Sequence, residues 1–202
     1  MSPTSHSNII AHNIFITPVL QFELDLDIGV LKKFCYDTRH KQTKGVQISN
    51  VGGWQSPALK GKMHPEFEKL KQRIIEASSK YHNYIKIKKS LNPKLSNIWI
   101  NINGKGHSNE YHTHPFATIS GTYYITDGSN LMFRHPLKYI NEFFWRENIL
   151  EDFSTTNSTT QTFSPKPNTL LLFPPWIDHK VEINKTDEER ISIAFNTMLQ
   201  NV

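Results

Sequence analysis

The sequence predicts a mainly β protein, an antiparallel jelly-roll barrel with α-helices on its flank. Three observations support this fold class. Helical patterns occur in the first 85 residues, short runs of alternating apolar and polar residues fill most of the rest, and the turns between those runs suit antiparallel connections better than helical crossovers. We expect one domain over residues 1–202, with helical support from 25 to 85 and a barrel core from 95 to 199.

The composition limits which kinds of site the protein can have. A chain of 202 residues with 37% hydrophobic residues, 12 Phe, 7 Tyr and 4 Trp has enough apolar surface for a core, which argues against wholesale disorder. Its single cysteine, Cys35, excludes an internal disulfide and a thiol-rich metal site. Any transition-metal site must therefore use histidines and carboxylates, and we expect a reducing compartment.

Charge and hydropathy give expectations about location and partners. The N-terminal stretch lacks a basic segment followed by a long apolar one, and no window approaches 18 apolar residues. We therefore expect a cytoplasmic protein without membrane contact. The net charge of +5 permits a nucleic-acid partner but does not indicate one, because only the stretch Lys86–Lys89, with Lys94 nearby, concentrates positive charge. No oligomeric state is indicated.

The first 85 residues predict a short strand and two helices. Strand-like residues occur at 14–16 and 19–24. Pro18 interrupts the strand between them, because proline has no N–H to donate to a sheet. Helices are predicted near 28–40, with Asp27 as the N-cap, and at 64–82. Between them the glycine-rich loop 43–57 surrounds Trp54, which either plugs the core or forms a wall of a substrate pocket.

From Leu95 onward the pattern is that of strands. The apolar residues in these runs alternate with period two or form short buried stretches, and the runs cover 98–102, 117–125, 131–133, 169–173, 180–183 and 190–195. Between 135 and 167 the pattern weakens, and the wholly polar stretch 154–162 predicts an insertion between barrel strands.

The densest set of residues able to bind a metal lies just before the strand at 117–125. His112 and His114 are two residues apart, so in an extended segment both side chains face the same way, and Glu110 has the same parity. A third histidine, His179, lies 65 positions after His114 and directly before the strand at 180–183. Three imidazoles, or two imidazoles and a carboxylate, would leave coordination positions open for other ligands.

A candidate anion-binding pair follows on the next strand. Arg190 and Ser192 share one strand face, and a planar guanidinium beside a hydroxyl is suited to hold a carboxylate. Such a pair would anchor a dicarboxylate whose other end chelates the metal. The alternative is that Arg190 forms a surface ion pair with Glu188 or Glu189.

Six short motifs follow one another along the chain. They are Ser49–Ser56, Trp99–Asn103, Tyr111–Pro115, Ser120–Tyr124, Phe173–His179 and Arg190–Asn196. Taken together, in this order and spacing, they resemble a known family, the small iron(II)- and 2-oxoglutarate-dependent oxygenases with a double-stranded β-helix that are common in bacteria and bacteriophages. The resemblance spans about residues 15–198.

The resemblance implies a non-haem dioxygenase with Fe(II) as cofactor and 2-oxoglutarate as co-substrate. Its metal would be bound by His112, the residue two positions on, and His179, and the distal carboxylate of 2-oxoglutarate by Arg190 and Ser192. The superfamily usually has Asp or Glu as the second ligand, whereas this chain has His114 there. Glu110 with His112 and His179 would be an alternative ligand set.

Four further residues are candidates near this site. Asn101 and Tyr123 are expected to contact the co-substrate, and Trp54 and Asn103 to contact the substrate; each asparagine and Tyr123 would otherwise only satisfy strand ends. The remaining histidines are expected to be surface or hydrogen-bonded residues, and they are His6, His12, His40, His64, His82, His107 and His135.

Three functions remain open on this basis. The first is hydroxylation or another oxidation of an unidentified small molecule or peptide, with release of succinate and CO2. The second is a three-histidine dioxygenase of the cupin type that uses no 2-oxo acid, and the third is a non-catalytic jelly-roll module that binds a ligand. The Trp54 loop, residues 134–150 and the insertion 154–162 are expected to shape the entrance to the cavity.

Overall fold

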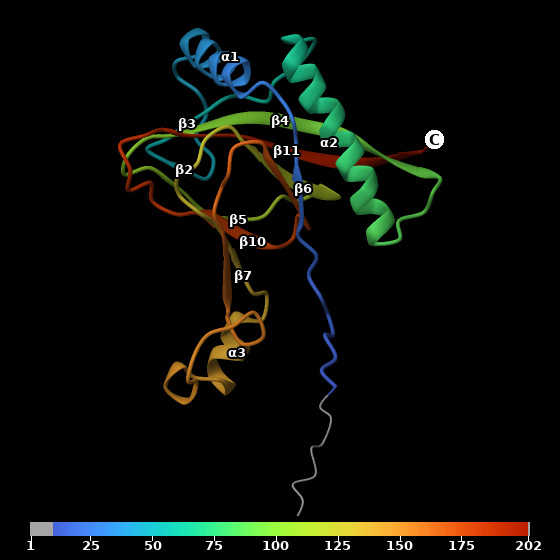
Figure 1. Ribbon diagram of the computed structural model, residues 1–202, viewed down its shortest axis with the longest axis vertical. Coiled ribbons are helices and arrows are strands. Elements are labelled where there is room, and N and C mark those ends of the chain that lie inside the picture. The colour runs from blue at the N-terminus through green and yellow to red at the C-terminus, as the bar shows by residue number, and fades with distance from the viewer. Residues whose placement is uncertain (1–9, 202) are drawn as a thin grey trace, which may run out of the picture.

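The computed structural model describes residues 10–201, and it shows two antiparallel sheets that face each other (Figure 1). The strand order is β1-β9-β6-β11-β4-β3 in the larger sheet and β2-β5-β10-β7-β8 in the smaller one. The strands of the larger sheet are β1 Leu20–Glu23, β3 Trp54–Gln55, β4 Leu91–Asn103, β6 Ile119–Tyr124, β9 Thr169–Phe173 and β11 Arg190–Asn201. Those of the smaller sheet are β2 Asn50–Val51, β5 Ser108–His112, β7 Leu131–Arg134, β8 Thr160–Phe163 and β10 Asp178–Val181. The predicted fold class, mainly antiparallel β with flanking helices, is confirmed.

Two long helices cover the outer face of the larger sheet (Figure 1). Helix α1 (Ile28–Lys41) begins at Asp27, whose side chain accepts a hydrogen bond from the backbone N–H of Val30 at 3.0 Å. Helix α2 (Pro65–Tyr84) follows His64 and has proline in its first turn, where no hydrogen-bond donor is needed. Both predicted helices are confirmed, and each extends slightly beyond its expected end.

The core has two parts, one on each side of the larger sheet. The main cluster fills the space between the two helices and the sheet and includes Leu31, Leu70, Ile100 and Ile193, all fully buried. A smaller cluster lies between the sheets, on β6, β7, β9, β10 and the residue before β10, and consists of Tyr124, Leu131, Phe133, Leu171, Phe173, Ile177 and Val181. β6 is therefore buried on both faces.

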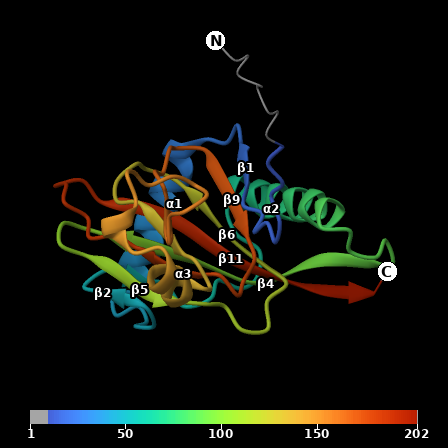
Figure 2. The same cartoon turned by 90° about the horizontal axis from the view of Figure 1, so that it is seen from below.

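Some elements differ from the sequence-based expectation. Residues 14–16 form no strand, and β1 covers only Leu20–Glu23. The polar insertion 154–162 overlaps β8, an edge strand that pairs with β7 and has little apolar alternation because it is largely solvent-exposed. Helix α3 (Lys138–Phe144) and the 3-10 turn η1 (Glu147–Ile149) belong to the segment between β7 and β8, which projects from the smaller sheet (Figures 1 and 2).

Among residues 10–201, no helix combines the length and apolar character needed to cross a membrane.

Candidate metal centre and co-substrate pocket

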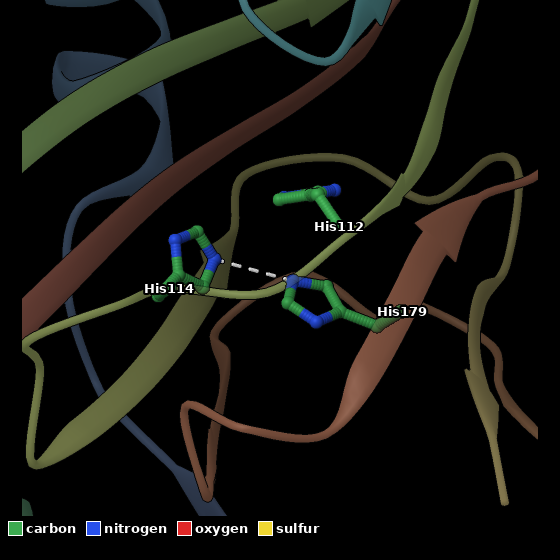
Figure 3. A group of neighbouring side chains, drawn as sticks. All are labelled: His112, His114 and His179. Atoms are coloured by element: carbon green, nitrogen blue, oxygen red, sulfur yellow. Dashed lines mark hydrogen bonds between the residues drawn. The ribbon is translucent and has the colours of Figure 1, made fainter. Parts of the chain in front are cut away.

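Three histidines from two segments of the chain meet on the inner face of the smaller sheet. His112 ends β5, His114 lies two residues further on, and His179 pairs directly with His112 in the neighbouring strand β10. One ring nitrogen from each lies within 4.8 Å of the others, and the rings converge (Figure 3). Within the described residues this is the one group of His, Cys, Asp or Glu with metal-site spacing.

Backbone carbonyls orient two of these rings. His112 Nδ1 lies 2.8 Å from the carbonyl of Glu110, and His179 Nδ1 lies 2.9 Å from the carbonyl of Ile177. A carbonyl can only accept, so each Nδ1 carries the proton and each Nε2 presents a lone pair. This is the usual arrangement of metal-binding imidazoles, whose second nitrogen donates to a carbonyl or carboxylate.

The third ring completes a set that fits a transition metal. His114 Nε2 lies 3.2 Å from His179 Nε2, as the dashed line in Figure 3 shows. Two ligands on one ion, each about 2.1 Å from it and at right angles, would lie about 3 Å apart. The spacing and the nitrogen donor set therefore suit a borderline cation such as Fe(II).

Burial keeps the three imidazoles neutral. Desolvation lowers the pKa of His179 to about 3 and that of His114 to about 4, and it lowers the pKa of His112 as well. The mutual repulsion of the rings adds to the first two shifts. At neutral pH all three are therefore in the form that binds a metal.

A β-bulge excludes Glu110 from this group. Along β10, His179 pairs with His112 but Val181 pairs with Asn109, so the three residues 179–181 of β10 face the four residues 109–112 of β5. The extra residue inverts the side-chain alternation, which leaves Glu110 exposed and turns the buried Asn109 toward the space between the sheets. The shared parity of Glu110 and the histidines therefore does not bring its carboxylate to the metal site.

The histidines line a cavity of about 530 Å³ between the two sheets. Arg190 and Ser192 line the same cavity from β11, and only 2% of each residue is exposed. Arg190 Nε donates to the carbonyl of Ser129, and Nη1 donates to Ser192 Oγ, both at 3.0 Å. Arg190 is thus a buried guanidinium in the cavity. The alternative interpretation, a surface ion pair with Glu188 or Glu189, is wrong, because Arg190 is buried and Glu189 pairs with Arg39 at 2.7 Å instead.

Tyr124, which the sequence analysis did not select, lies beside Arg190. The centre of its ring is 5.3 Å from the Arg190 guanidinium carbon, and its buried hydroxyl has no hydrogen-bond partner among the described residues. Burial raises the pKa of Tyr124 to about 12, so the hydroxyl stays protonated and can donate. An unpaired buried donor next to a buried cation fits an anionic ligand.

Tyr123, the residue that was predicted there, points the other way. Its side chain is fully buried in the main core cluster under the helices, and its hydroxyl donates to Asn168 Oδ1. The prediction failed because every residue of β6 is buried, so the sequence offers no apolar–polar alternation that fixes which side faces inward.

The other predicted residues divide between the cavity and its surroundings. Asn101 lines the cavity, and its buried Oδ1 has no partner among the described residues. Asn103 and Trp54 are not among the lining residues. Asn103 donates to Asn109 Oδ1 at 2.9 Å, and Trp54 packs against the main core while its indole donates to the carbonyl of Gln42 at 2.9 Å. Trp54 therefore has the core-plug position that was its alternative interpretation.

The other histidines lie outside the metal group. His64 Nδ1 accepts from the N–H of Glu66 at the start of α2, and His107 Nδ1 accepts from the N–H of Gly104. His135 Nδ1 accepts from the N–H of Leu137, which is likewise a local structural contact. His82 is buried, its two ring nitrogens have no partner among the described residues, and burial lowers its pKa. His6 lies outside the described residues.

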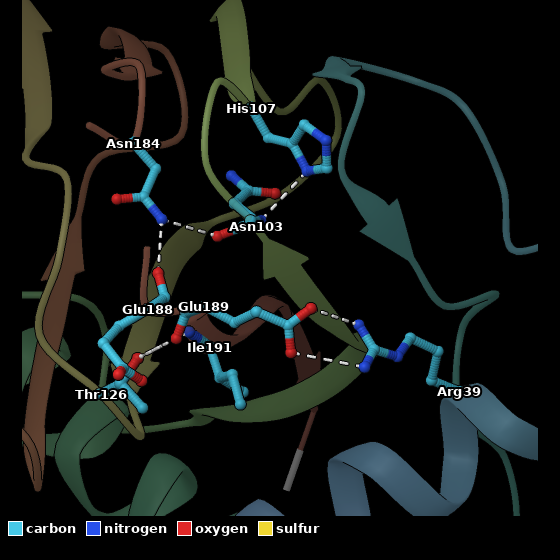
Figure 4. A network of polar contacts seen from close by, with 9 residues as sticks. Arg39, Asn103, His107, Thr126, Asn184, Glu188, Glu189 and Ile191 are labelled. Atoms are coloured by element: carbon cyan, nitrogen blue, oxygen red, sulfur yellow. Dashed lines mark hydrogen bonds and ion pairs between the residues drawn. The ribbon is translucent and has the colours of Figure 1, made fainter. Parts of the chain in front are cut away.

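Hydrogen bonds hold the backbone of Glu189 and Ile191, the two neighbours of Arg190 in the chain, and Figure 4 shows both residues beside Thr126. Thr126 Oγ1 donates to the carbonyl of Glu189 at 3.1 Å and accepts from the N–H of Ile191 at 2.8 Å. The side chain of Glu189 is held by Arg39 of α1. One threonine and one ion pair thus set the position from which the guanidinium enters the cavity.

Comparisons with known proteins agree with this site. Residues 97–196 match the family described as "Putative 2OG-Fe(II) oxygenase", a range that contains the three histidines, Arg190 and Ser192. No curated protein sequence matches the chain.

Several solved structures share the fold at low sequence identity. A prolyl-4-hydroxylase from Pseudomonas putida is 10% identical with a TM-score of 0.61, over 90% of this chain and 92% of that chain. The non-heme alpha ketoglutarate dependent carbocyclase SnoK from nogalamycin biosynthesis is 13% identical with a TM-score of 0.64, over 92% and 82%. HygX from Streptomyces hygroscopicus, with nickel and 2-oxoglutarate bound, is 13% identical with a TM-score of 0.57, over 90% and 83%.

These structures show the fold, and the family match adds the chemistry. The family uses Fe(II) and 2-oxoglutarate, and the described structure offers a three-nitrogen metal site and a buried guanidinium in one cavity. Through residues 97–196 the chain belongs to the 2-oxoglutarate- and iron(II)-dependent oxygenases, and the protein is an oxidoreductase of that family.

Proposed function

We propose that the protein is a dioxygenase that inserts oxygen into a C–H bond of a substrate and releases succinate and CO2. Iron(II) would be held by His112, His114 and His179. The observation that carries the proposal is the convergence of three neutral imidazoles in a cavity that also contains the buried guanidinium of Arg190. With iron(II) and 2-oxoglutarate bound, one atom of dioxygen would enter succinate and the other would enter the substrate as a hydroxyl group.

The chain's own residues bind and orient the co-substrate. Arg190 donates from Nε and Nη1 to Ser129 and Ser192, and no hydrogen bond within residues 10–201 uses its Nη2. Nη2, the hydroxyl of Ser192 and the unpaired hydroxyl of Tyr124 form a donor set for the distal carboxylate of 2-oxoglutarate. Asn101, which pairs with Ser192 across β4 and β11, lies beside this set.

The inner end of the cavity shields Arg190, Ser192 and His179 from bulk water. Arg190, Ser192 and His179 are each exposed by 4% or less, and β6 and β9 close the space behind them with buried apolar side chains. In such a low-dielectric site the attraction between the guanidinium and a dicarboxylate is stronger than at the surface.

Two measurements test the proposal: anaerobic binding of Fe(II) and 2-oxoglutarate, and then oxygen consumption and succinate formation after oxygen is added. Wild-type protein with Fe(II) and 2-oxoglutarate is expected to consume oxygen and to form succinate, slowly without substrate and faster with it. His179→Ala is expected to lose metal binding, whereas Arg190→Ala should keep the metal and lose at least tenfold in 2-oxoglutarate affinity. If Arg190→Ala kept wild-type affinity for 2-oxoglutarate, the assignment of the carboxylate site would be wrong.

The same assay separates the two alternative functions. A cupin-type three-histidine dioxygenase would consume oxygen without forming succinate. A non-catalytic binding module would show no oxygen uptake with Fe(II) and 2-oxoglutarate under any condition. The buried guanidinium favours the 2-oxoglutarate mechanism, because an enzyme without the oxo acid has no need for a buried cation at that position.

A further inference from the structure

The inner wall of the cavity continues well beyond the co-substrate residues. On β11 the side chains that line the cavity are Arg190, Ser192, Ala194 and Asn196, at alternate positions. From residue 190 to residue 196 a strand rises about 20 Å, and a five-carbon diacid fills only part of this length. The end of the wall at Asn196 is therefore available to a second molecule, the substrate.

A hydrogen bond fixes the amide of Asn196 at this end. Its Oδ1 accepts from the hydroxyl of Ser120 on β6 at 2.6 Å. Only 8% of Asn196 is exposed, and no hydrogen bond within residues 10–201 uses its Nδ2. Because Oδ1 is occupied on the β6 side, Asn196 presents an unpaired NH2 donor to the cavity that it lines.

A second amide lies opposite the first. Asn97 on β4 pairs in register with Asn196 and also lines the cavity. Its Oδ1 accepts from the hydroxyl of Ser96 at 3.3 Å, so its Nδ2 is likewise left as a donor. Two amide donors on adjacent strands form a site for an oxygen that can accept two hydrogen bonds.

The charge of the cavity favours the same kind of group. Arg190 is the one lining residue with a permanent charge in the described part of the chain, and no carboxylate lines the cavity. Between the amides and the histidines stands Trp99, whose ring centre lies 5.7 Å from that of His114, opposite the small Ala194 in the register. The wall thus offers donors at its end and an apolar surface beside the metal site.

We propose that Asn97 and Asn196 bind an acceptor group of the substrate, a carboxylate or an amide carbonyl, while an apolar part of the substrate packs on Trp99 beside the histidines. The proposal rests on the function proposed above, which places the reacting part of the substrate beside the histidines. Ser120 is a positioning residue in this site, since it holds the Asn196 amide with its donor toward the cavity.

Binding of matched aromatic probes tests the proposal. The full chain is loaded with Ni(II), which supports no turnover, and with saturating 2-oxoglutarate so that Arg190 is occupied. Dissociation constants are measured by ligand-observed NMR for phenylacetate, phenylacetamide and 2-phenylethylamine. We expect the two acceptor probes to bind and the amine to bind at least tenfold more weakly, and the tighter of the two acceptors identifies carboxylate or amide as the preferred group.

Introduction of a negative charge in place of either amide provides the specific control. Asn196→Asp and, independently, the half-buried Asn97→Asp replace a donor by an anion, so each is expected to weaken phenylacetate binding at least tenfold. Asn201→Asp adds the same charge to an exposed end of β11 outside the cavity and should leave binding unchanged. Ser120→Ala should weaken both acceptor probes, because the Asn196 amide is then free to rotate.

Three results would overturn the inference: no binding of either acceptor probe, equal binding of the amine, or equal phenylacetate affinity in wild type and both aspartate variants. The 2-oxoglutarate affinity of the same samples separates this failure from failure of the proposed function. If 2-oxoglutarate binds normally while the probes do not respond to the variants, the substrate site is wrong and the oxygenase function stands.

Discussion

At the scale of single residues, His114 determines the charge of the metal site. A neutral imidazole stands where the superfamily usually has a carboxylate, so both positive charges of a divalent ion remain uncompensated by the protein. A dianionic co-substrate then gains more attraction than it would beside a two-histidine, one-carboxylate site. The buried Arg190 adds a further positive charge to the same cavity.

Replacing this histidine by a carboxylate tests the effect. His114→Asp should keep metal binding and weaken 2-oxoglutarate at least tenfold, since one unit charge at about 4 Å is worth up to about 4 kcal/mol at an effective dielectric constant of 20. Ni(II) and 2-oxoglutarate dissociation constants from calorimetry measure both effects. His114→Ala is the control, which should lose the metal; tighter 2-oxoglutarate binding by His114→Asp would contradict the charge argument.

Cys35 gives a second test at this scale. The residue is fully buried in the main core, and burial raises the pKa of its thiol to about 12 from an ordinary value of 9.0. Between pH 9 and about pH 12 the thiol therefore keeps its proton in the folded protein and loses it in the unfolded chain. The contribution of this thiol to the free energy of unfolding is present below pH 9 and declines as the pH rises from 9 toward 12.

A thiol reagent measures that burial directly. At pH 8 Ellman's reagent should label native protein at least a hundredfold more slowly than protein unfolded in guanidinium chloride, which should release one equivalent of chromophore. Rapid stoichiometric labelling of the native protein would show that Cys35 is accessible and that the packing of α1 on the sheet is incorrect.

The limits of prediction at the residue scale follow from strand geometry. The histidines and Arg190 were predictable because metal-binding and anion-binding residue types stand at the ends or on one face of predicted strands, inside motifs that resemble the family. The positions of Glu110 and Tyr123 were not predictable: the first depends on a bulge in β5, and the second lies in a strand buried on both faces. Neither feature leaves a periodic signal in the sequence.

At the scale of elements, the turn between β6 and β7 positions the co-substrate arginine. Ser129 accepts from Arg190 Nε, and Thr126 bonds the backbone on both sides of Arg190. Gly128 has φ +129°, and a Cβ there would lie 3.0 Å from the Cβ of Arg190, so the turn and the arginine are closely packed. The family motif identifies Arg190, but the contribution of this turn emerges only from the structure.

Thr126→Val removes both hydrogen bonds while it keeps the size of the side chain. We expect 2-oxoglutarate affinity to fall about tenfold with unchanged Ni(II) affinity, because the guanidinium loses its fixed backbone and the histidines lie on other strands. Thr126→Ser should restore the affinity, and the exposed Thr162→Val on β8 is the matched control. Equal losses of metal and 2-oxoglutarate binding would indicate general destabilisation instead.

The elements themselves were predicted to different degrees. Helices α1 and α2 have a capping residue and a long apolar stripe, so both their existence and their ends follow from local rules. β8 was not predicted because it is a polar edge strand, stabilised by pairing with β7 and not by burial. Its formation depends on pairing with a strand that is distant in the sequence, and not on an apolar pattern of its own.

At the scale of the whole molecule, the cavity brings residues of both sheets together in one candidate site. The histidines belong to the smaller sheet and its loop, whereas Arg190 and Ser192 belong to the larger one. A molecule that bridges the metal and the guanidinium therefore contacts both sheets. Helical patterns and strand alternation alone do not reveal that these two sheets face each other at the site.

Thermal unfolding tests this coupling. At pH 7.5, Ni(II) should raise Tm and 2-oxoglutarate should raise it further only when the metal is present, since both bind the folded state alone. Binding at 100 times the dissociation constant corresponds to about 2.7 kcal/mol of added stability. In Arg190→Ala the metal shift should remain and the 2-oxoglutarate shift should vanish; an equal 2-oxoglutarate shift without metal would contradict the coupling.

Anomalous scattering from an anaerobic crystal with Fe(II) and 2-oxoglutarate tests the central claim most directly. The account predicts one iron peak about 2.1 Å from a ring nitrogen of each of His112, His114 and His179, with the distal carboxylate of the oxo acid on Arg190 and Ser192. An iron peak elsewhere, or rings that turn apart so that they share no ion, would contradict it.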